Sequence, residues 1–224
     1  MENTSSIYIV IPAYNVADRR LRAVLEQLRT LPYQVVVVDD GSGDATAEIA
    51  REFTTVISHP LNRGQGAALL TGMRYALQQG AEIIVHFDAD GQMDPNDIAA
   101  MIAPLQQNEE LDLVLGSRFL QVNNIPWTKK YLLQKPALIF QHLTSGLRLT
   151  DVHNGFRAFR ATAAARLDIR QDRMAHASEI IMQIKRHGWR YQEVPVTIRY
   201  YDYGQGLVGG LRIIGDLLKQ RLIK

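Results

Sequence analysis

The chain has 224 residues, a length that suits one domain, or one domain with a modest extension, around a full hydrophobic core. Its formal net charge of +2 is too small to indicate a nucleic-acid partner. There is no cysteine, so disulfides and thiolate metal sites are excluded, which agrees with a reducing compartment.

Short β-branched runs alternate with helical patterns over the first half of the chain. Strands are predicted over residues 7–11, 35–38, 56–57, 83–87 and 111–116. Helices are predicted around residues 21–28 and over 64–79. Two more helices are predicted, one with Asp44 and the other with Asp94 as its N-cap. This alternation predicts an α/β fold with a mostly parallel sheet, helices on both of its faces, and ligands bound beyond the carboxyl ends of the strands.

The second half has a less regular pattern. It predicts strands over residues 155–159 and 191–200 and helices over 175–187 and 207–224. The last helix is amphipathic, and two interpretations stay open for it: it lies on an anionic membrane surface, or it packs on the domain. The first residues lack the pattern of a signal peptide, and no segment approaches the ~20 apolar residues of a membrane span. We therefore expect a cytoplasmic protein, peripheral to the membrane if the first interpretation holds.

An acidic cluster directly follows the strand predicted over residues 83–87. Asp88, Asp90 and Gln92 alternate along it, so in an extended or tightly turning segment their side chains share a face. Three oxygen ligands suit Mg²⁺ or Mn²⁺, which keep positions for phosphate oxygens. The alternative is a polar strand end whose aspartates cap the next helix, a role that Asp94 fills better.

Two further polar segments follow predicted strands. Asp39 and Asp40 can accept hydrogen bonds from a base and a ribose, although turn chemistry alone accounts for the same residues. The Asn62–Ala67 stretch precedes a helix, so that its amides and Arg63 can face an anion. Nucleotide binding at one edge of the sheet is one interpretation of these segments, and ordinary turn structure is the other.

The segments, taken in order, resemble glycosyltransferase family 2, whose members have the Rossmann-like GT-A fold. The matches cover residues 9–15, 35–44, 62–67, 88–92, 116–118, 154–159 and 188–199, which is nearly the whole chain. Within the family the chain is most similar to the dolichyl- and polyprenyl-phosphate mannose and glucose synthases. It departs from them at Gln65, where that group commonly has lysine, and it lacks the membrane spans of some relatives.

The resemblance implies a role for each matched polar position. Residues implied to bind the nucleotide sugar are Pro12, Ala13, Tyr14, Asn15, Asp39, Asp40, Arg63, Gly66, Asp88 and Ala89. The implied metal ligands are Asp88, Asp90 and Gln92, with Mg²⁺ or Mn²⁺ offsetting the charge of the leaving nucleoside diphosphate. Asp90 is the ligand that we expect catalysis to depend on most.

Two acceptor classes make different demands on the second half. A phosphate acceptor is already ionised, and Arg118 and Arg157 match arginines that bind phosphate in polyprenyl-phosphate synthases, although each could instead pair with a structural carboxylate. A hydroxyl acceptor requires a general base, for which Asp151 and Glu179 are the candidates.

Together with the residues, the resemblance implies an inverting, metal-dependent transferase that moves a hexose from a nucleoside-diphosphate sugar to a lipid-linked acceptor, most simply polyprenyl phosphate. One alternative is transfer to a sugar hydroxyl in surface-polysaccharide assembly. Another is a catalytically silent nucleotide-sugar-binding protein. We expect one continuous GT-A domain in which residues 1–118 bind the donor and residues 119–224 form the acceptor side.

Overall fold

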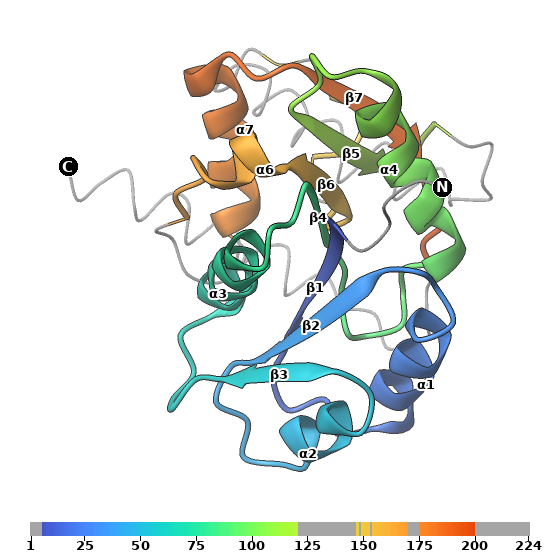
Figure 1. Cartoon of the computed structure of the whole chain (residues 1–224), viewed down its shortest axis with the longest axis vertical. Coiled ribbons are helices and arrows are strands. Elements are labelled where there is room, and N and C mark those ends of the chain that lie inside the picture. Colours follow the sequence, from blue (N-terminus) through green and yellow to red (C-terminus); the bar gives the residue numbers. More distant parts are fainter. Residues whose placement is uncertain (1–5, 121–146, 148, 153, 170–174, 200–224) are drawn as a thin grey trace, which may run out of the picture.

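The computed structural model describes residues 6–120, 147, 149–152, 154–169 and 175–199 (Figure 1). The strands of this part are β1 (Ile7–Ala13), β2 (Gln34–Asp39), β3 (Thr55–Ser58), β4 (Ile83–His86), β5 (Leu113–Ser117), β6 (Arg157–Arg160) and β7 (Tyr191–Pro195). The helices are α1 (Arg19–Leu28), α2 (Thr46–Arg51), α3 (Gln65–Gln78), the 3₁₀ helix η2 (Pro95–Asp97), α4 (Ile98–Gln107), α6 (Ala161–Ala164) and α7 (Ala175–His187).

The strands form one mostly parallel sheet in the order β3-β2-β1-β4-β6-β5-β7. Parallel pairing joins β1 to β2 and β4, β2 to β3, and β5 to β7. Strand β6 lies antiparallel between β4 and β5, with Val85 opposite Ala158 and Val114 opposite Ala158 on the other side. Strands from both sides of residue 118 thus share the sheet, while the division into donor and acceptor parts stays a prediction.

Each face of the sheet is covered by helices, as the alternation of strands and helices predicts. On one face, Ile9 packs in a cluster with Leu25 of α1 and with α4. On the other face, Val10 packs in a cluster with Met73 of α3 and Ile180 of α7. Figure 1 shows α1 and α4 on one side and α3, α6 and α7 on the opposite side. Successive residues of a strand point to opposite faces, so that a β-branched run is buried along its whole length.

Three details of the sequence prediction are wrong. The predicted strand 191–200 ends at Pro195, beyond which the chain leaves β5 and forms a bridge between Ile198 and Met93. The N-cap of α2 is Ala45, because the helix begins one residue later than predicted. Asp44 still serves that helix, since its Oδ1 accepts a hydrogen bond from the amide of Thr46 at 3.0 Å. Helix α6 was not predicted, because a four-residue alanine-rich turn carries no periodic signal.

The other predicted helices and strands of this part are present, with ends that differ by at most two residues, and one predicted helix falls outside it. Asp94 caps η2, and its side chain accepts a hydrogen bond from the amide of Asn96. The amphipathic helix predicted over residues 207–224 lies outside the described residues. Among the helices that are described, none has the length and apolar character needed to cross a membrane.

Helix α3 lies unusually close to the sheet because of Gly72. A Cβ added at this residue would lie 2.3 Å from Cγ1 of Val10 in β1 and 3.1 Å from Cγ2 of Val38 in β2. Real Cβ atoms do not approach other heavy atoms to 2.3 Å, so α3 or the sheet would have to shift. The close packing fixes α3, whose first turn lies at the edge where β1 ends.

We predict that Gly72→Ala destabilises the fold. Alanine favours a helix by about 1 kcal/mol relative to glycine, but the overpacked methyl group costs about 1–3 kcal/mol. Urea unfolding should therefore show a lower free energy of unfolding than the wild type. In the Val10→Ala background the same substitution should cost less, because the clashing methyl is gone. An equal cost in both backgrounds would show that the contact with Val10 is not the cause.

Candidate active site

The predicted polar segments meet at one edge of the sheet. Asp39 is the last residue of β2, and Asp88 and Arg118 follow the carboxyl ends of the parallel strands β4 and β5. Because β6 runs in the opposite direction, its first residue, Arg157, lies at this same edge. Four chain segments thus converge here, in agreement with the rule for ligand sites in open α/β sheets.

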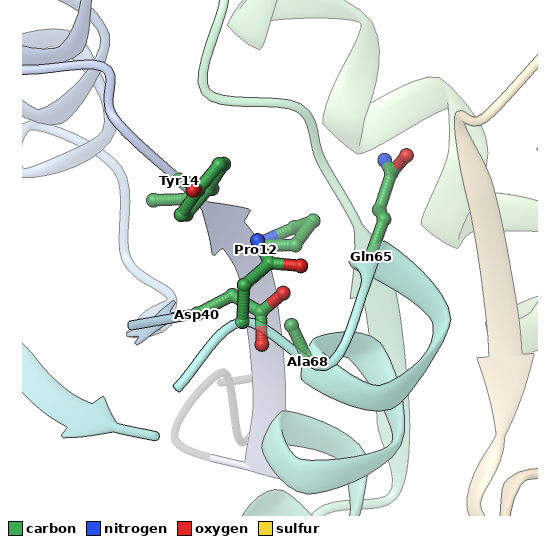
Figure 2. Close-up of a pocket in the computed structure, with 7 residues that line it drawn as sticks. Pro12, Tyr14, Asp40, Gln65 and Ala68 are labelled. Carbon is green, nitrogen blue, oxygen red and sulfur yellow. The ribbon is translucent and has the colours of Figure 1, made fainter. Parts of the chain in front are cut away.

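A pocket of about 250 Å³ lies between the end of β1 and the first turn of α3 (Figure 2). It is lined by Pro12, Ala13, Tyr14, Asp40, Asn62, Gln65 and Ala68. Figure 2 shows Pro12 and Tyr14 at the end of β1 on one side, and Gln65 and Ala68 of α3 on the other. Tyr14 is 48% exposed, so its ring is available at the mouth of the pocket. Four of the residues predicted to bind the donor are thus brought together.

Asn15 and Asp39 lie beside this pocket and organise its neighbouring loop. Asn15 has a positive φ of 50°, and its amide donates to Ser42 Oγ at 2.9 Å. Its Oδ1 accepts a hydrogen bond from the amide of Gly43 at 2.9 Å. The buried Asp39 accepts from the amide of Ser42 through Oδ1 at 3.1 Å. These bonds tie the loops after β1 and β2 together, and the predicted contact of Asp39 with a base stays a prediction.

Asp40 binds the turn that precedes α3. Its carboxylate accepts hydrogen bonds from the amides of Arg63 at 3.0 Å and Gly64 at 2.7 Å. Nδ1 of the buried His59 lies 2.7 Å from the same carboxylate. The Arg63 side chain is exposed, and Gly66 is buried in the first turn of α3.

The predicted metal motif, residues 88–92, is joined to the pocket through Gln65, which lines the pocket and also contacts Asp88. Nε2 of Gln65 donates to Oδ1 of Asp88 at 3.0 Å, and the amide of Gln92 donates to Oδ1 of Asp90 at 2.9 Å. Burial, followed by repulsion from Asp90, raises the pKa of Asp88 to about 7, against the opposing effects of Arg157 and of the Gln65 hydrogen bond. Ala89 differs from its neighbours, because its side chain is buried in the core cluster shared with α1 and α4.

These residues fit a hard divalent cation. Two adjacent carboxylates that repel one another are stabilised by a cation between them, and carboxylate and amide oxygens are ligands that Mg²⁺ and Mn²⁺ accept. The described part of the chain has no cluster of three Asp, Glu, His or Cys side chains suited to a metal. The site would therefore consist of the carboxylates of Asp88 and Asp90, the side-chain oxygen of Gln92 and the oxygens of a bound diphosphate.

Two other segments support the motif. A Cβ added at Gly155 would lie 3.2 Å from Oδ2 of Asp88, so the backbone before β6 packs directly against this carboxylate. The chain after β7 runs beside the loop: Arg199 donates through its amide to Gln92 O at 2.8 Å and through Nη2 to Asp94 Oδ2 at 2.6 Å. The loop that carries the carboxylates is therefore held from both sides.

The two predicted arginines occupy different environments. Arg118 binds Asp151 in a bidentate pair, with Nε 2.6 Å from Oδ2 and Nη2 2.8 Å from Oδ1. Arg157 is 2% exposed, and burial lowers the pKa of its guanidinium to about 10, while Asp88 and Asp151 act in the opposite direction. Arg157 is thus a buried cation at neutral pH, next to a predicted metal ligand.

The two candidate bases are placed differently. Asp151 is buried, and both of its oxygens accept hydrogen bonds from Arg118. Glu179 is half-buried on α7, which packs over the face of the sheet that α3 also covers. Glu179 and His176 are three residues apart on this helix, and the His176 side chain lies outside what the structure describes.

Sequence reasoning missed two residues that build this edge. Glu193 of β7 accepts hydrogen bonds from the amide and hydroxyl of Thr150, each at 2.9 Å, and so anchors the segment that carries Asp151. His59 contacts Asp40 from the end of β3. The sequence offered a hint for each residue. Glu193 lies inside the segment 188–199 that resembles the family, and His59 lies three residues before the matched segment 62–67.

Comparisons with known proteins agree with this geometry. The family model described as glycosyl transferase family 2 matches residues 8–167. A UDP-N-acetylglucosamine–dolichyl-phosphate N-acetylglucosaminyltransferase of Methanococcus voltae is 33% identical, over 97% of this chain and 97% of its own. An undecaprenyl-phosphate mannosyltransferase of Micrococcus luteus is 30% identical, over 94% of this chain and 90% of its own.

A similar fold occurs in glucosyl-3-phosphoglycerate synthase from Mycobacterium tuberculosis, solved with Mn²⁺, UDP and glucosyl-3-phosphoglycerate. It has a TM-score of 0.71 and 19% identity, over 96% of this chain and 79% of that one. The pocket at the end of β1 and the paired carboxylates after β4 thus occur in a sheet of known type. The chain belongs to glycosyltransferase family 2 and is a glycosyltransferase with the GT-A fold.

Proposed function

We propose that the enzyme transfers a hexose, with inversion, from a nucleoside-diphosphate sugar to polyprenyl phosphate, and that it requires Mg²⁺ or Mn²⁺. The observation that carries this proposal is the pair of carboxylates, Asp88 and Asp90, beside a pocket that ends at the first turn of α3. Asp88 would hold the cation with Asp90 and Gln92. When bound, the cation supplies positive charge beside the diphosphate as the bond to the sugar breaks.

The donor would lie in the pocket between β1 and α3. Tyr14 is exposed at its mouth, and Gln65 bridges from the pocket to Asp88. The amides of Gln65 and Gly66 precede the first hydrogen bonds of α3, which Ala67 and Ala68 donate to Gly64 O. Amides at such a helix start favour the negative charge of a diphosphate. In this proposal the nucleotide lies on the side of β1, β2 and β3, and the sugar lies towards β6.

A phosphate acceptor is supported from two directions. The relatives at 33% and 30% identity are named for transfer to dolichyl phosphate and undecaprenyl phosphate. In this chain, Arg118 and Arg157 lie at the same edge of the sheet as the pocket, on the side of β5 and β6. Both oxygens of Asp151 accept hydrogen bonds from Arg118, an arrangement that suits an ion pair better than a general base. An ionised phosphate attacks without losing a proton, so it requires no base. A lipid-linked acceptor would bring the enzyme to a membrane surface.

The proposal is tested with a donor panel. UDP-, GDP- and dTDP-hexoses should be incubated with Mg²⁺ or Mn²⁺ and either a short polyprenyl phosphate or a soluble saccharide, followed by chromatography of the products. We expect a sugar–phosphate–lipid product that forms only with a divalent cation and one class of nucleotide. Product on the saccharide alone would instead support transfer to a hydroxyl group.

The variants Glu179→Gln and Arg157→Ala distinguish a phosphate acceptor from a hydroxyl acceptor. If the acceptor is a phosphate, the variant should lose much less than the ~10²–10⁴-fold that a general base contributes. Arg157→Ala should raise the acceptor KM and lower kcat, because charge and orientation are lost together. Both constants should be measured with the same donor. A loss of activity of about 10²–10⁴-fold in Glu179→Gln, together with a mild effect of Arg157→Ala, would contradict the phosphate acceptor.

Asp90→Asn tests the metal assignment without relying on turnover. The amide keeps an oxygen that can accept from the Gln92 amide, so the loop should fold as before. We expect Mn²⁺ affinity, measured by calorimetry, to fall by more than about 100-fold, since even groups behind metal ligands alter affinity by about 10–100-fold. Asp112→Asn, which removes a carboxylate that accepts from Arg190 outside this edge, is the charge-matched control.

Gly155→Ala tests the packing against Asp88. The new methyl group would lie 3.2 Å from Oδ2, a contact that pushes the carboxylate from its position. We predict a several-fold loss of Mn²⁺ affinity with little change in the melting temperature. Gly43→Ala is the matched control, because a Cβ there has no heavy atom within 4 Å. Equal metal affinities in the two variants would contradict the packing argument.

A further inference from the structure

A buried network behind the donor pocket has no role in the chemistry described so far. It joins Asp40 at the end of β2, His59 after β3, and Thr71 in α3. Nδ1 of His59 lies 2.7 Å from Asp40 Oδ1, and Nε2 lies 2.9 Å from Thr71 Oγ1. Asp40 is 2% and His59 8% exposed. Because a carboxylate only accepts, the proton of this imidazole is placed on Nδ1.

The network ends on the backbone of the turn before α3. Asp40 Oδ1 accepts from the Arg63 amide at 3.0 Å as well as from His59, and Oδ2 accepts from the Gly64 amide at 2.7 Å. Three of the roughly four acceptor positions of this carboxylate are thus used by the protein. Hydrogen bonds to a charged group are stronger than neutral ones, so they hold the turn firmly.

This turn requires such support because its backbone is unusual. Gly64 has a φ of 91°, a backbone conformation that is strained for residues with a side chain. Glycine adopts it without strain but loses more conformational freedom on folding than other residues do. The preceding residues are packed tightly, since a Cβ at Gly41 would lie 2.5 Å from the carbonyl carbon of Leu61. The turn therefore has few alternative positions while the network is intact.

The same turn carries side chains that face the donor. Asn62 and Gln65 line the pocket on either side of the two amides bound by Asp40. Gln65 also donates to Asp88 Oδ1 at 3.0 Å. A displacement of the turn would therefore change the pocket wall and the hydrogen bond to Asp88 together.

We infer that His59 is a positioning residue for the nucleoside-diphosphate donor, acting through Asp40 on the turn at residues 62–65. It touches neither donor nor metal ligand, and it orients the carboxylate that fixes the turn. In this arrangement Asp40 stabilises the turn that forms one wall of the pocket, through its hydrogen bonds to the amides of Arg63 and Gly64. The inference rests on the proposed function, because it assigns the pocket to a donor.

The test compares three variants with the wild type. His59→Ala removes both contacts, Thr71→Val removes only the hydroxyl partner, and His59→Asn keeps an N–H donor near the position of Nδ1. UDP, GDP and dTDP binding with Mn²⁺ is measured by calorimetry, and amide hydrogen exchange is followed over residues 62–66. Leu28→Ala, in the core at the end of α1 on the opposite face of the sheet, is the stability control.

We expect His59→Ala to weaken nucleotide binding by about tenfold or more, as for the loss of a hydrogen bond to a charged group, and to speed exchange in the turn. His59→Asn should recover most of the affinity, and Thr71→Val should lie between. Leu28→Ala should lower the melting temperature while leaving affinity unchanged. If His59→Ala does not fold, Thr71→Val and His59→Asn are compared in its place.

Two kinds of failure are distinguishable. If the wild type binds a nucleotide and His59→Ala binds it equally well, or if Leu28→Ala weakens binding as much, the positioning role is overturned and the proposed function stands. If the wild type binds none of UDP, GDP and dTDP with Mn²⁺, the proposed donor site itself is contradicted, and the inference with it.

Discussion

Burial of the Asp88 carboxylate beside Asp90 is the constraint on which this site depends. A carboxylate at the end of a buried strand loses hydration, and a second carboxylate opposes its ionisation, so its pKa rises to about 7. The surrounding contacts reduce this cost: Gln65 donates a hydrogen bond, and Arg157 supplies a buried positive charge. Each group comes from a different element, so the fold must bring α3, β4 and β6 together at one edge.

The antiparallel strand β6 makes this convergence possible. Inserted between β4 and β5, it places its amino-terminal end where the neighbouring parallel strands have their carboxyl ends. Gly155 then reaches Asp88 closely enough that a side chain would collide with the carboxylate. A wholly parallel sheet would place the start of this strand at the opposite edge, away from the predicted metal ligands. Among the described strands, β6 is the antiparallel one, and its direction is what adds a buried arginine to the site.

The strands and the carboxylate motif could be predicted from the sequence, because periodicity and strand ends are local signals. The pairings across the site could not. Arg118 and Asp151 are 33 residues apart, and His59 and Asp40 are 19 apart, so only the folded chain shows that each aspartate has a partner within the protein. The predicted strand over 191–200 failed for a related reason: after Pro195 the chain pairs with the loop around Met93, a contact without periodicity.

The charges at this edge suggest why donor and acceptor would bind in the presence of a cation. Asp88 and Asp90 lie together with the buried Arg157 beside Asp88, whereas Asp151 is paired with Arg118. Two carboxylates are thus opposed by one guanidinium next to the pocket, and they repel a diphosphate when both are ionised. A divalent cation held by Asp88 and Asp90 would add two positive charges there, which favours an anionic donor and an anionic acceptor. Metal, donor and acceptor would then bind interdependently, with the metal loop as the element that couples them.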